Sequence, residues 1–415
     1  MNVLINAYAC RPNSGSEGGM TWRWIEGLAK KGVQVFVITE GEWREEIDRT
    51  ISSSPHQHLI HFYYNPVSDR IRKMCWNQGD YRFYYYYRKW QKKTLKIAES
   101  IIKDYQIDVI HQLSMIGFRE PGYLWRIKGI PYIWGPIGGM SLVPLEYIED
   151  TSLKIKTKYW LKNQISKLQF SCSPKVLAAF KHADVLIAAN QNSYKLIKAK
   201  YPNKKVVLIN ETGCGSQTVE VRERKGKEIF NILWVGRIIP TKLLKLSLEV
   251  FVKIKDLEGI KLHIVGEGIN DKETKFYHSL SSASGLDQKC EWHGWVSHEE
   301  VQRLMLNSDV LFFPSVVEGT PHVVLEAIAN NLPIVCFDVC GQGDVVNDEV
   351  GIKIPLSNPS DSIIKFSEVL KRLYENRDLL DRMSKGCMKR KEELSWDKKI
   401  IQVYKIYQGL SHGEC

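Results

Sequence analysis

The chain has 415 residues, of which 44% are hydrophobic and 25% charged, a composition typical of a folded globular protein. Because one hydrophobic core rarely extends over so many residues, the length predicts two domains. No apolar run reaches the roughly 18 residues of a membrane-spanning helix, so we expect a cytoplasmic protein with neither a transmembrane helix nor a signal peptide. The nine cysteines are scattered and odd in number, which favours reduced thiols over disulfides or a zinc site.

The net charge of +11 indicates an acidic partner. Nucleic acid is not expected, because no DNA- or RNA-binding signature accompanies the charge. An anionic membrane surface fits better, since a predicted helix over residues 153–168 carries lysines beside an apolar stripe. The stripe consists of Leu153, Trp160, Leu161, Ile165 and Leu168. It could equally pack on the helix's own domain, and the sequence leaves both alternatives open.

Strands and helices alternate along the first half of the chain. An apolar strand at residues 3–7 is followed by a small-residue loop at 13–19, a helix that ends near Gly32, and a strand at 33–38. This order predicts a βαβ unit with a right-handed crossover. Further strands are expected at residues 58–63, 108–112, 131–134 and 185–188.

The second half repeats the alternation after a polar segment at residues 212–228. Its strands are expected at residues 230–235, 262–265, 290–292, 310–313 and 334–337, and an amphipathic helix follows Ser395. The sequence therefore predicts an α/β protein with two Rossmann-like β/α/β domains that face each other across a cleft. We expect the first domain to cover residues 1–210 and the second 211–394.

Two glutamates flank a predicted strand-to-helix turn after residue 313. The helix start is predicted from Gly319, from Thr320 as a cap, and from Pro321 in the first helical position, where no N–H is needed. Glu318 then lies at the mouth of the turn and Glu326 about two turns into the helix. The unpaired N–H groups of the helix start suit an anion, and a carboxylate suits the hydroxyls of a sugar. An ordinary capped helix with two solvated glutamates has the same spacing.

The residues around these glutamates resemble glycosyltransferase family 4, the retaining GT-B glycosyltransferases. The matching residues, in the family's order, are Pro314, Ser315, Glu318, Gly319, Leu325, Glu326, Ala327, Pro333, Gly341 and Gly351. Three further segments match family landmarks: residues 233–242, 262–268 and 293–296. The resemblance is dense over residues 231–355 and thinner over 1–40, 107–140 and 395–410. It implies the GT-B architecture, with a C-terminal helix at 395–415 that returns to the N-terminal domain.

The resemblance also implies which residues bind the nucleotide-sugar donor. Arg237 and Lys242, after Gly236, would neutralise the departing diphosphate. Backbone donors would come from Gly15 and Ser16 in the first domain, and in the second from the segment of Gly319, Thr320, Pro321 and His322, in which every residue except the proline has an N–H. Glu326 is expected to bind the ribose, Glu318 to lie near the transferred sugar, and Val296 with the loop from Gly266 to Gly268 to line the base.

The acceptor side matches the family less well. His111 falls on a strand end where many relatives carry two histidines, but Leu113 occupies the second histidine position. His111 could therefore serve catalysis or be a buried histidine bonded to the backbone. Arg119, Gly138 and Gly139 are the remaining candidates for acceptor binding.

These observations predict a retaining glycosyltransferase that moves a sugar from a UDP- or GDP-sugar to a glycan or lipid-linked glycan, as in surface polysaccharide biosynthesis. No Asp-x-Asp is present, so no metal and no other cofactor are expected. Two alternatives are a sugar-nucleotide epimerase on the same scaffold and a non-catalytic nucleotide-binding component of a polysaccharide assembly. A dinucleotide oxidoreductase is disfavoured, because no Gly-x-Gly-x-x-Gly opens either half.

Overall fold

A computed structural model describes residues 1–15, 17–76, 80–148, 153–215, 228–268 and 270–411. The chain forms two compact units. The first comprises Met1–Met140, Gln164–Thr212 and Trp396–Cys415, and the second comprises Ser141–Asn163 and Gly213–Ser395. The domain ranges expected from the sequence stay a prediction. Most of the predicted connecting segment, residues 216–227, lies outside the described residues.

The first unit is built on a seven-stranded sheet with the order β3-β2-β1-β4-β5-β6-β7, in which every neighbouring pair is parallel. The strands are β1 (Asn2–Asn6), β2 (Gln34–Thr39), β3 (Ile60–Tyr64), β4 (Val109–Gln112), β5 (Tyr132–Ile137), β6 (Val185–Ala188) and β7 (Lys205–Leu208). The order reverses between β1 and β4. In doubly wound sheets the loops beyond the carboxyl ends of the strands at such a reversal bind ligands.

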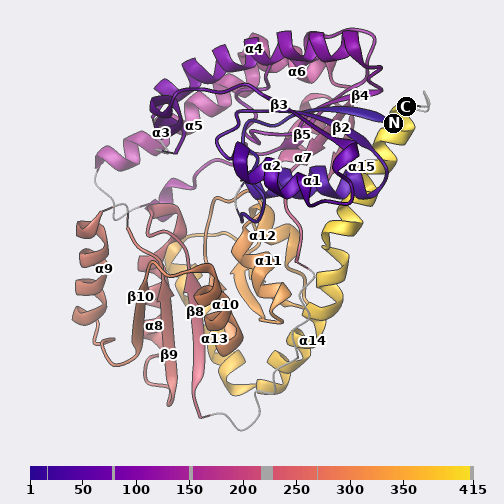
Figure 1. Cartoon of the computed structure of the whole chain (residues 1–415). Helices are drawn as coiled ribbons and strands as arrows, with labels where there is room; N and C mark the ends of the chain where they lie inside the picture. Colours follow the sequence, from indigo (N-terminus) through magenta and orange to yellow (C-terminus); the bar gives the residue numbers. More distant parts are fainter. Residues whose placement is uncertain (16, 77–79, 149–152, 216–227, 269, 412–415) are drawn as a thin grey trace. The chain divides into compact units, whose positions relative to one another are not determined.

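Helices cover both faces of this sheet (Figure 1). They are α1 (Glu17–Lys30), α2 (Arg44–Ser52), α3 (Asp69–Trp76), α4 (Arg82–Asp104), α6 (Pro174–His182), α7 (Gln191–Lys200) and α15 (Trp396–Ser411), with short 3-10 turns at Gln57–Leu59 and Leu124–Arg126. Alternate residues of β1 face opposite layers, as the strand period of two requires. Val3 and Ile5 pack in a core with α1 and α15, whereas Leu4 packs in a core with α4 and α6.

The C-terminal helix α15 completes the first unit by packing on α1 (Figure 1). Ile400, Val403 and Tyr407 of α15 are buried in the core that α1 shares. The two helices approach closely at Gly27, where an added Cβ would lie 2.5 Å from a side-chain carbon of Ile400. The prediction that the end of the chain returns to the N-terminal part is confirmed.

The second unit is built on a six-stranded parallel sheet with the order β10-β9-β8-β11-β12-β13. Its strands are β8 (Phe230–Val235), β9 (Ile260–Val265), β10 (Cys290–Gly294), β11 (Val310–Phe313), β12 (Ile334–Phe337) and β13 (Gly351–Ile354). Its helices are α8 (Leu244–Ile254), α9 (Asp271–Ala283), α10 (His298–Asn307), α11 (His322–Ala329), α12 (Cys340–Val345), α13 (Pro359–Glu375) and α14 (Arg377–Glu393), with 3-10 turns at Leu145–Ile148 and Pro240–Lys242. One core contains residues of α8 and α13, and the other contains residues of α10 and α11.

The predicted pair of Rossmann-like sheets is therefore confirmed, with two additions and one shift. The edge strands β7 and β13 were not predicted. Each is only four residues long and partly exposed, so neither has the continuous apolar run that marked the central strands. Residues 58 and 59, expected to open a strand, belong instead to the 3-10 turn Gln57–Leu59, and β3 begins at Ile60.

Helix α5 (Leu153–Cys172) contains the point at which the chain passes from the second unit to the first. Its buried side chains are polar. Asn163 Oδ1 accepts from the N–H of Val143 at 3.0 Å, Asn163 Nδ2 donates to the carbonyl oxygen of Val143 at 2.9 Å, and Ser166 is 5% exposed. The five apolar residues of the predicted stripe are 46–80% exposed. The alternative in which this stripe packs on the helix's own domain is therefore wrong. Among the described helices, none is both long enough and apolar enough to cross a bilayer.

Candidate functional site

An ion pair in the predicted donor site joins Lys242 to Glu318. Lys242 ends the 3-10 turn after β8, and Glu318 lies in the loop after the adjacent strand β11. Lys242 Nζ is 2.5 Å from Glu318 Oε1, and the two side chains are only 17% and 15% exposed. The ammonium also lies 4.7 Å from the ring centroid of Phe313, and the Ser315 hydroxyl donates to the same Oε1 at 2.5 Å. The lysine charge is thus fixed in position at the carboxyl edge of the second sheet.

Backbone hydrogen bonds hold the two loops together. The N–H of Val316 donates to the carbonyl oxygen of Thr241 at 3.1 Å. On the other side, the N–H of Gly341 donates to the carbonyl oxygen of Gly319 at 2.9 Å. A Cβ on Gly341 would lie 2.0 Å from that oxygen, so only glycine permits this approach. Glu318 and Gly319 are therefore held between the loops after β8 and β12.

Helix α11 begins at His322, with Pro321 in the N-cap position. The prediction that Thr320 caps the helix and that Pro321 takes its first position is wrong by one residue, because Pro321 is extended (φ −70°, ψ 118°) and no side chain caps the helix start. Thr320 is 2% exposed. Glu326 consequently lies on the second turn of α11.

Glu326 is a half-buried carboxylate. Burial raises its pKa above the ordinary value, and the charge of nearby His298 lowers it by a smaller amount. Within the described part of the chain, its carboxylate has no hydrogen-bond or ion-pair partner. A half-buried carboxylate of this kind is stabilised most by a ligand whose hydroxyl groups donate hydrogen bonds to it.

The loop after β8 brings Gly236 against Gly266. The N–H of Gly236 donates to the carbonyl oxygen of Val265 at 2.9 Å, and a Cβ on Gly266 would lie 1.9 Å from the carbonyl oxygen of Gly236. Gly266 also has a φ of 129°, so both sterics and backbone conformation require glycine there. A Cβ on Gly236 would lie 3.4 Å from Cδ of Lys242, which places the lysine stem beside this glycine. Arg237 is exposed.

The residues predicted to line the base also lie together. The N–H of Gly266 donates to the carbonyl oxygen of Gly294 at 2.9 Å, which brings the Gly266–Gly268 loop beside the segment with Val296. Glu267 Oε1 accepts from the N–H of Trp295 at 3.2 Å. The Trp295 ring is 74% exposed and was not predicted as a site residue, although an exposed aromatic side chain beside a base site is a usual stacking surface.

In the first unit, the predicted residues gather after β1, β4 and β5. Glu17 opens α1, and its Oε1 accepts from the N–H of Ile116 at 3.0 Å; burial raises the pKa of Glu17 to about 7. The N–H of Gly138 donates to the carbonyl oxygen of Ile116 at 2.9 Å. Gly15 is exposed in the preceding loop, whereas Ser16 lies outside the described residues. Glu17 was not predicted as a site residue, because acidic residues at helix starts are common.

Arg119 and Gly139 extend this group. Arg119 Nη2 donates to the Ser166 hydroxyl at 2.5 Å, and its guanidinium lies 4.7 Å from the ring centroid of Phe118. A Cβ on Gly139 would lie 3.4 Å from Arg119 Nη1, and Gly139 has a φ of 71°. The structure thus brings Arg119, Gly138 and Gly139 together with Glu17 at the carboxyl edge of the first sheet.

His111 has the environment of a structural histidine. It is fully buried, and its Nε2 lies 2.6 Å from the carbonyl oxygen of Gly135, to which it must donate. Its Nδ1 then accepts from the Tyr407 hydroxyl, also at 2.6 Å. Burial lowers the pKa of His111 to about 4, so the ring is neutral at neutral pH. Of the two roles considered for His111, the geometry favours the buried histidine, and Leu113 beside it is core.

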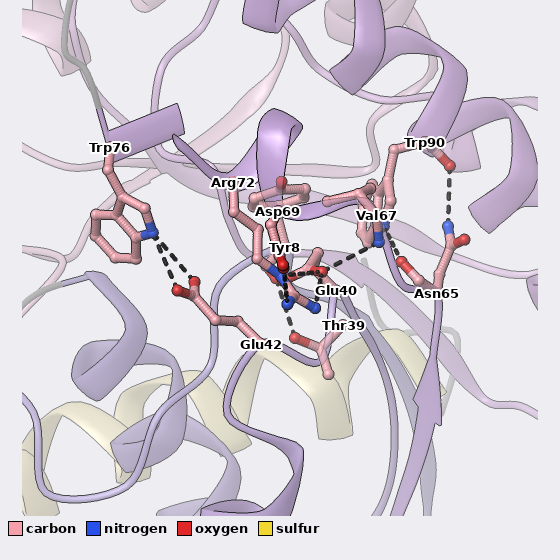
Figure 2. Close-up of polar contacts among 10 residues, drawn as sticks. All are labelled: Tyr8, Thr39, Glu40, Glu42, Asn65, Val67, Asp69, Arg72, Trp76 and Trp90. Atoms are coloured by element: carbon pink, nitrogen blue, oxygen red, sulfur yellow. Dashed lines mark hydrogen bonds and ion pairs between the residues drawn. The ribbon is translucent and has the colours of Figure 1, made fainter. Parts of the chain in front are cut away.

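A second polar network lies at the same edge of the first sheet (Figure 2). Glu40 follows β2 and is 3% exposed; its Oε1 accepts from Arg72 at 3.0 and 2.8 Å and from the N–H of Val67 at 3.1 Å. Figure 2 also shows the Trp76 indole directed at the Glu42 carboxylate, at 3.2 Å. This network fixes the loop after β3 and the helix α3 against the end of β2.

Comparisons with known proteins agree with this geometry. Residues 217–390 match the family described as Glycosyl transferases group 1. The chain is 24% identical to an uncharacterized glycosyltransferase of Methanocaldococcus jannaschii, over 76% of this chain and 79% of the relative. It is 22% identical to the UDP-Gal:alpha-D-GlcNAc-diphosphoundecaprenol alpha-1,3-galactosyltransferase of Escherichia coli, over 71% of this chain and 73% of the relative. The sucrose-phosphate synthase of Thermosynechococcus elongatus has a similar fold, with a TM-score of 0.65, 15% identity and 99% of both chains covered.

The two Rossmann-like sheets and these matches define a glycosyltransferase of the GT-B fold. Over residues 217–390 the chain matches the glycosyl transferases group 1, and these similarities support the transfer of a sugar from a nucleotide-sugar donor.

Proposed function

We propose that the protein is a retaining, metal-independent hexosyltransferase that moves a sugar from a UDP- or GDP-sugar onto a glycan or lipid-linked glycan during the synthesis of a surface polysaccharide. The second unit binds the donor, and the first unit binds the acceptor through Arg119, Gly138 and Gly139.

The observation that carries the proposal is the Lys242–Glu318 pair beside the start of α11. A diphosphate leaving group gains negative charge as the bond to the sugar breaks, and a fixed cation stabilises that charge without reorganising. Lys242 is held in place by Glu318 and by the ring of Phe313. Arg237, exposed in the same loop, adds a second cation that can bind a phosphate in a fork. The half-buried carboxylate of Glu326 offers the acceptor that ribose hydroxyls need.

The proposed chemistry is a front-side displacement. The bond between C1 of the sugar and the diphosphate oxygen breaks, and the acceptor oxygen bonds to C1 on the same face. The proton of the acceptor hydroxyl passes to the oxygen of the departing phosphate, which becomes the base as its charge grows. Arg237 and Lys242 stabilise that charge, and Glu318 positions Lys242 and the sugar. The backbone N–H groups of Gly319, Thr320 and His322 bind the phosphate oxygens.

Two observations support a UDP-sugar and a lipid-linked acceptor. The Escherichia coli relative is named for UDP-Gal and for an acceptor on diphosphoundecaprenol. Helix α5 exposes Leu153, Trp160 and Leu168 among lysines, the composition of a helix that lies on an anionic bilayer. We therefore assign the enzyme to the inner face of the cytoplasmic membrane, bound peripherally through α5.

A thermal-shift screen followed by a transfer assay tests the proposal. We expect UDP or GDP, and the matching sugar nucleotide, to raise the melting temperature, and transfer to require an added lipid-linked or free glycan acceptor. Conversion of the sugar nucleotide without any acceptor would identify an epimerase instead. Nucleotide binding without turnover on any acceptor would identify a non-catalytic component.

A further inference from the structure

A group of two histidines and a glutamate lies on the edge of the second sheet, outside the residues assigned to the donor. His263 is on β9, and Glu291 and His293 are on the edge strand β10. Glu291 is the direct register partner of His263. The ligand atoms of the three side chains all lie within 4.8 Å of one another.

A bulge in β10 directs the third side chain toward the other two. The register between β9 and β10 shifts between Trp292 and Gly294, so His293 is the extra residue of the strand. Bulges of this kind re-aim a side chain. As a result, His293 Nε2 lies 3.1 Å from His263 Nδ1, and Glu291 Oε2 lies 3.3 Å from the same Nδ1. Two ligands of a tetrahedral Zn²⁺, each about 2.0–2.1 Å from the ion, lie about 3.4 Å apart.

The hydrogen bonds around His263 determine its tautomer. They therefore determine which ring nitrogen presents a lone pair to Glu291 and His293. Asn231 Nδ2 donates to the carbonyl oxygen of Asn307 at 3.4 Å, which leaves its Oδ1 facing His263 Nε2 at 3.0 Å. An amide oxygen only accepts, so His263 Nε2 carries the proton. In the neutral ring, Nδ1 therefore presents a lone pair to the Glu291 carboxylate, and two acceptors face each other without a hydrogen between them.

A proton or a cation can resolve this conflict. Lys261 pairs with the other oxygen of Glu291 and so does not reach between Glu291 Oε2 and His263. A hydrogen bond donated by His293 Nε2 satisfies His263 Nδ1. Glu291 Oε2 still faces the same Nδ1 without a hydrogen between the two atoms.

We propose that His263 Nδ1, His293 Nε2 and Glu291 Oε2 bind one divalent transition-metal ion of the Zn²⁺ class, with Asn231 orienting His263 and a water molecule as the fourth ligand. Two imidazoles and one carboxylate are a usual ligand set for such an ion, and a histidine that donates its second N–H to a fixed acceptor is the usual outer shell. The ion would bind β10 to β9. His293 directly precedes Gly294, whose carbonyl oxygen accepts from Gly266, so the metal would also hold the segment with Trp295 and Val296 in place.

Metal binding by the whole chain, stripped with a chelator, tests this proposal without an activity assay. Zn²⁺ is titrated in competition with a chromophoric chelator, and Co²⁺ is added as an optical probe. We expect one Zn²⁺ per chain, and Co²⁺ absorption of a four-coordinate site without the charge-transfer band of a thiolate ligand. Hydrogen exchange of Cys290–Gly294 should slow when Zn²⁺ is added.

Variants assign the ligands. His263→Ala, His293→Ala and Glu291→Gln should each abolish stoichiometric binding, and Asn231→Ala should weaken it by about 10–100-fold. His278→Ala is the matched control, because this exposed histidine of α9 stacks on Trp292 of the same strand without contributing to the group. If a histidine variant fails to fold, Zn²⁺ binding by the nearly isosteric Glu291→Gln and by Asn231→Ala, which changes a residue outside the ligand set, tests the proposal instead. Unchanged binding in these variants, a thiolate band, or no Zn²⁺ binding by the unmodified chain would overturn the proposal.

Discussion

The hydroxyl of Tyr407 and Nδ1 of His111 lie 2.6 Å apart, although 296 residues separate them in the chain. The bond joins the C-terminal helix α15 to β4 in the centre of the first sheet. His111 stays neutral because burial lowers its pKa, whereas the hydrogen bond to Gly135 raises the pKa by a smaller amount.

The buried neutral His111 should make the fold sensitive to acid. Its pKa is lowered to about 4, whereas an exposed histidine titrates near 6.5, so below about pH 6.5 the unfolded chain binds a proton that the folded chain refuses. This stabilisation is present above pH 6.5 and is lost as the pH falls toward 4, by up to about 3 kcal/mol. Melting temperatures of the unmodified protein and of His111→Asn, measured from pH 7.5 to 4.5, should converge as the pH falls. A constant difference between the two would contradict this assignment.

Glu326→Ala should weaken the binding of the nucleoside diphosphate by roughly 1–3 kcal/mol, because a ribose hydroxyl loses a charged acceptor. Titration calorimetry measures the loss. Glu299→Ala, which removes an exposed carboxylate of α10, is the control and should bind as the unmodified protein does. Equal affinity of the two variants for every nucleotide that binds would remove Glu326 from the site.

Arg237→Ala and Lys242→Ala should lower turnover more than nucleotide binding. The two charges matter most as the bond to the diphosphate breaks, so we expect a loss in kcat of roughly 10²–10³-fold for each and a smaller change in nucleotide affinity. Steady-state kinetics and calorimetry separate the two effects. Lys245→Ala, three residues further along in α8, is the control. A double variant with near-normal kcat would exclude both residues from the mechanism.

Transfer should survive chelation, and neither Mg²⁺ nor Mn²⁺ should raise it, because side-chain cations are assigned to the diphosphate. Assays after dialysis against a chelator check this. Restoration by Mg²⁺ or Mn²⁺ alone would show that a metal acts at the phosphates. Restoration by Zn²⁺ alone would be expected only if the ion at His263 and His293 supports the nucleotide site.

Changing Lys154, Lys156, Lys158 and Lys162 of α5 to Glu should release the protein from anionic vesicles without affecting nucleotide binding. Each basic residue near such a surface contributes about 1 kcal/mol, so binding should also weaken as salt rises. Vesicle flotation measures the association. The control carries the same change in charge on α4, with Lys92, Lys93, Lys96 and Lys103 changed to Glu. If the unmodified protein does not float with anionic vesicles at low salt, α5 is not a membrane-binding helix.

The sequence predicts the fold well because its central strands are continuous apolar runs between helices of regular period. The donor residues of the second unit stay a prediction, and the structure brings three residues from two of the motifs, Lys242, Glu318 and Ser315, into direct contact. In the structure, helix α11 starts at His322, one residue later than predicted from the sequence, because a proline fits the N-cap position as well as the first helical position.

What the sequence could not supply were contacts made across the fold. The partner of His111 is a tyrosine near the other end of the chain, and no local pattern connects them. The two most buried side chains of α5, Asn163 and Ser166, are polar, and apolar periodicity alone assigns such residues to solvent. The group of His263, Glu291 and His293 likewise depends on strand register and on one bulge.

The packing of α15 on α1 has a consequence for how this protein is made. The ribosome releases all of the second unit before it releases the helix that finishes the first. At a synthesis rate of about 5–20 residues per second, the opening residues therefore wait on the order of ten seconds or more for their last helix. Until then, the apolar face of α1 that receives Ile400 and Tyr407 is uncovered. Of the two units, the one that contains residues 1–140 is thus the later to mature, and a ribosome that stalls shortly before residue 396 leaves that unit incomplete.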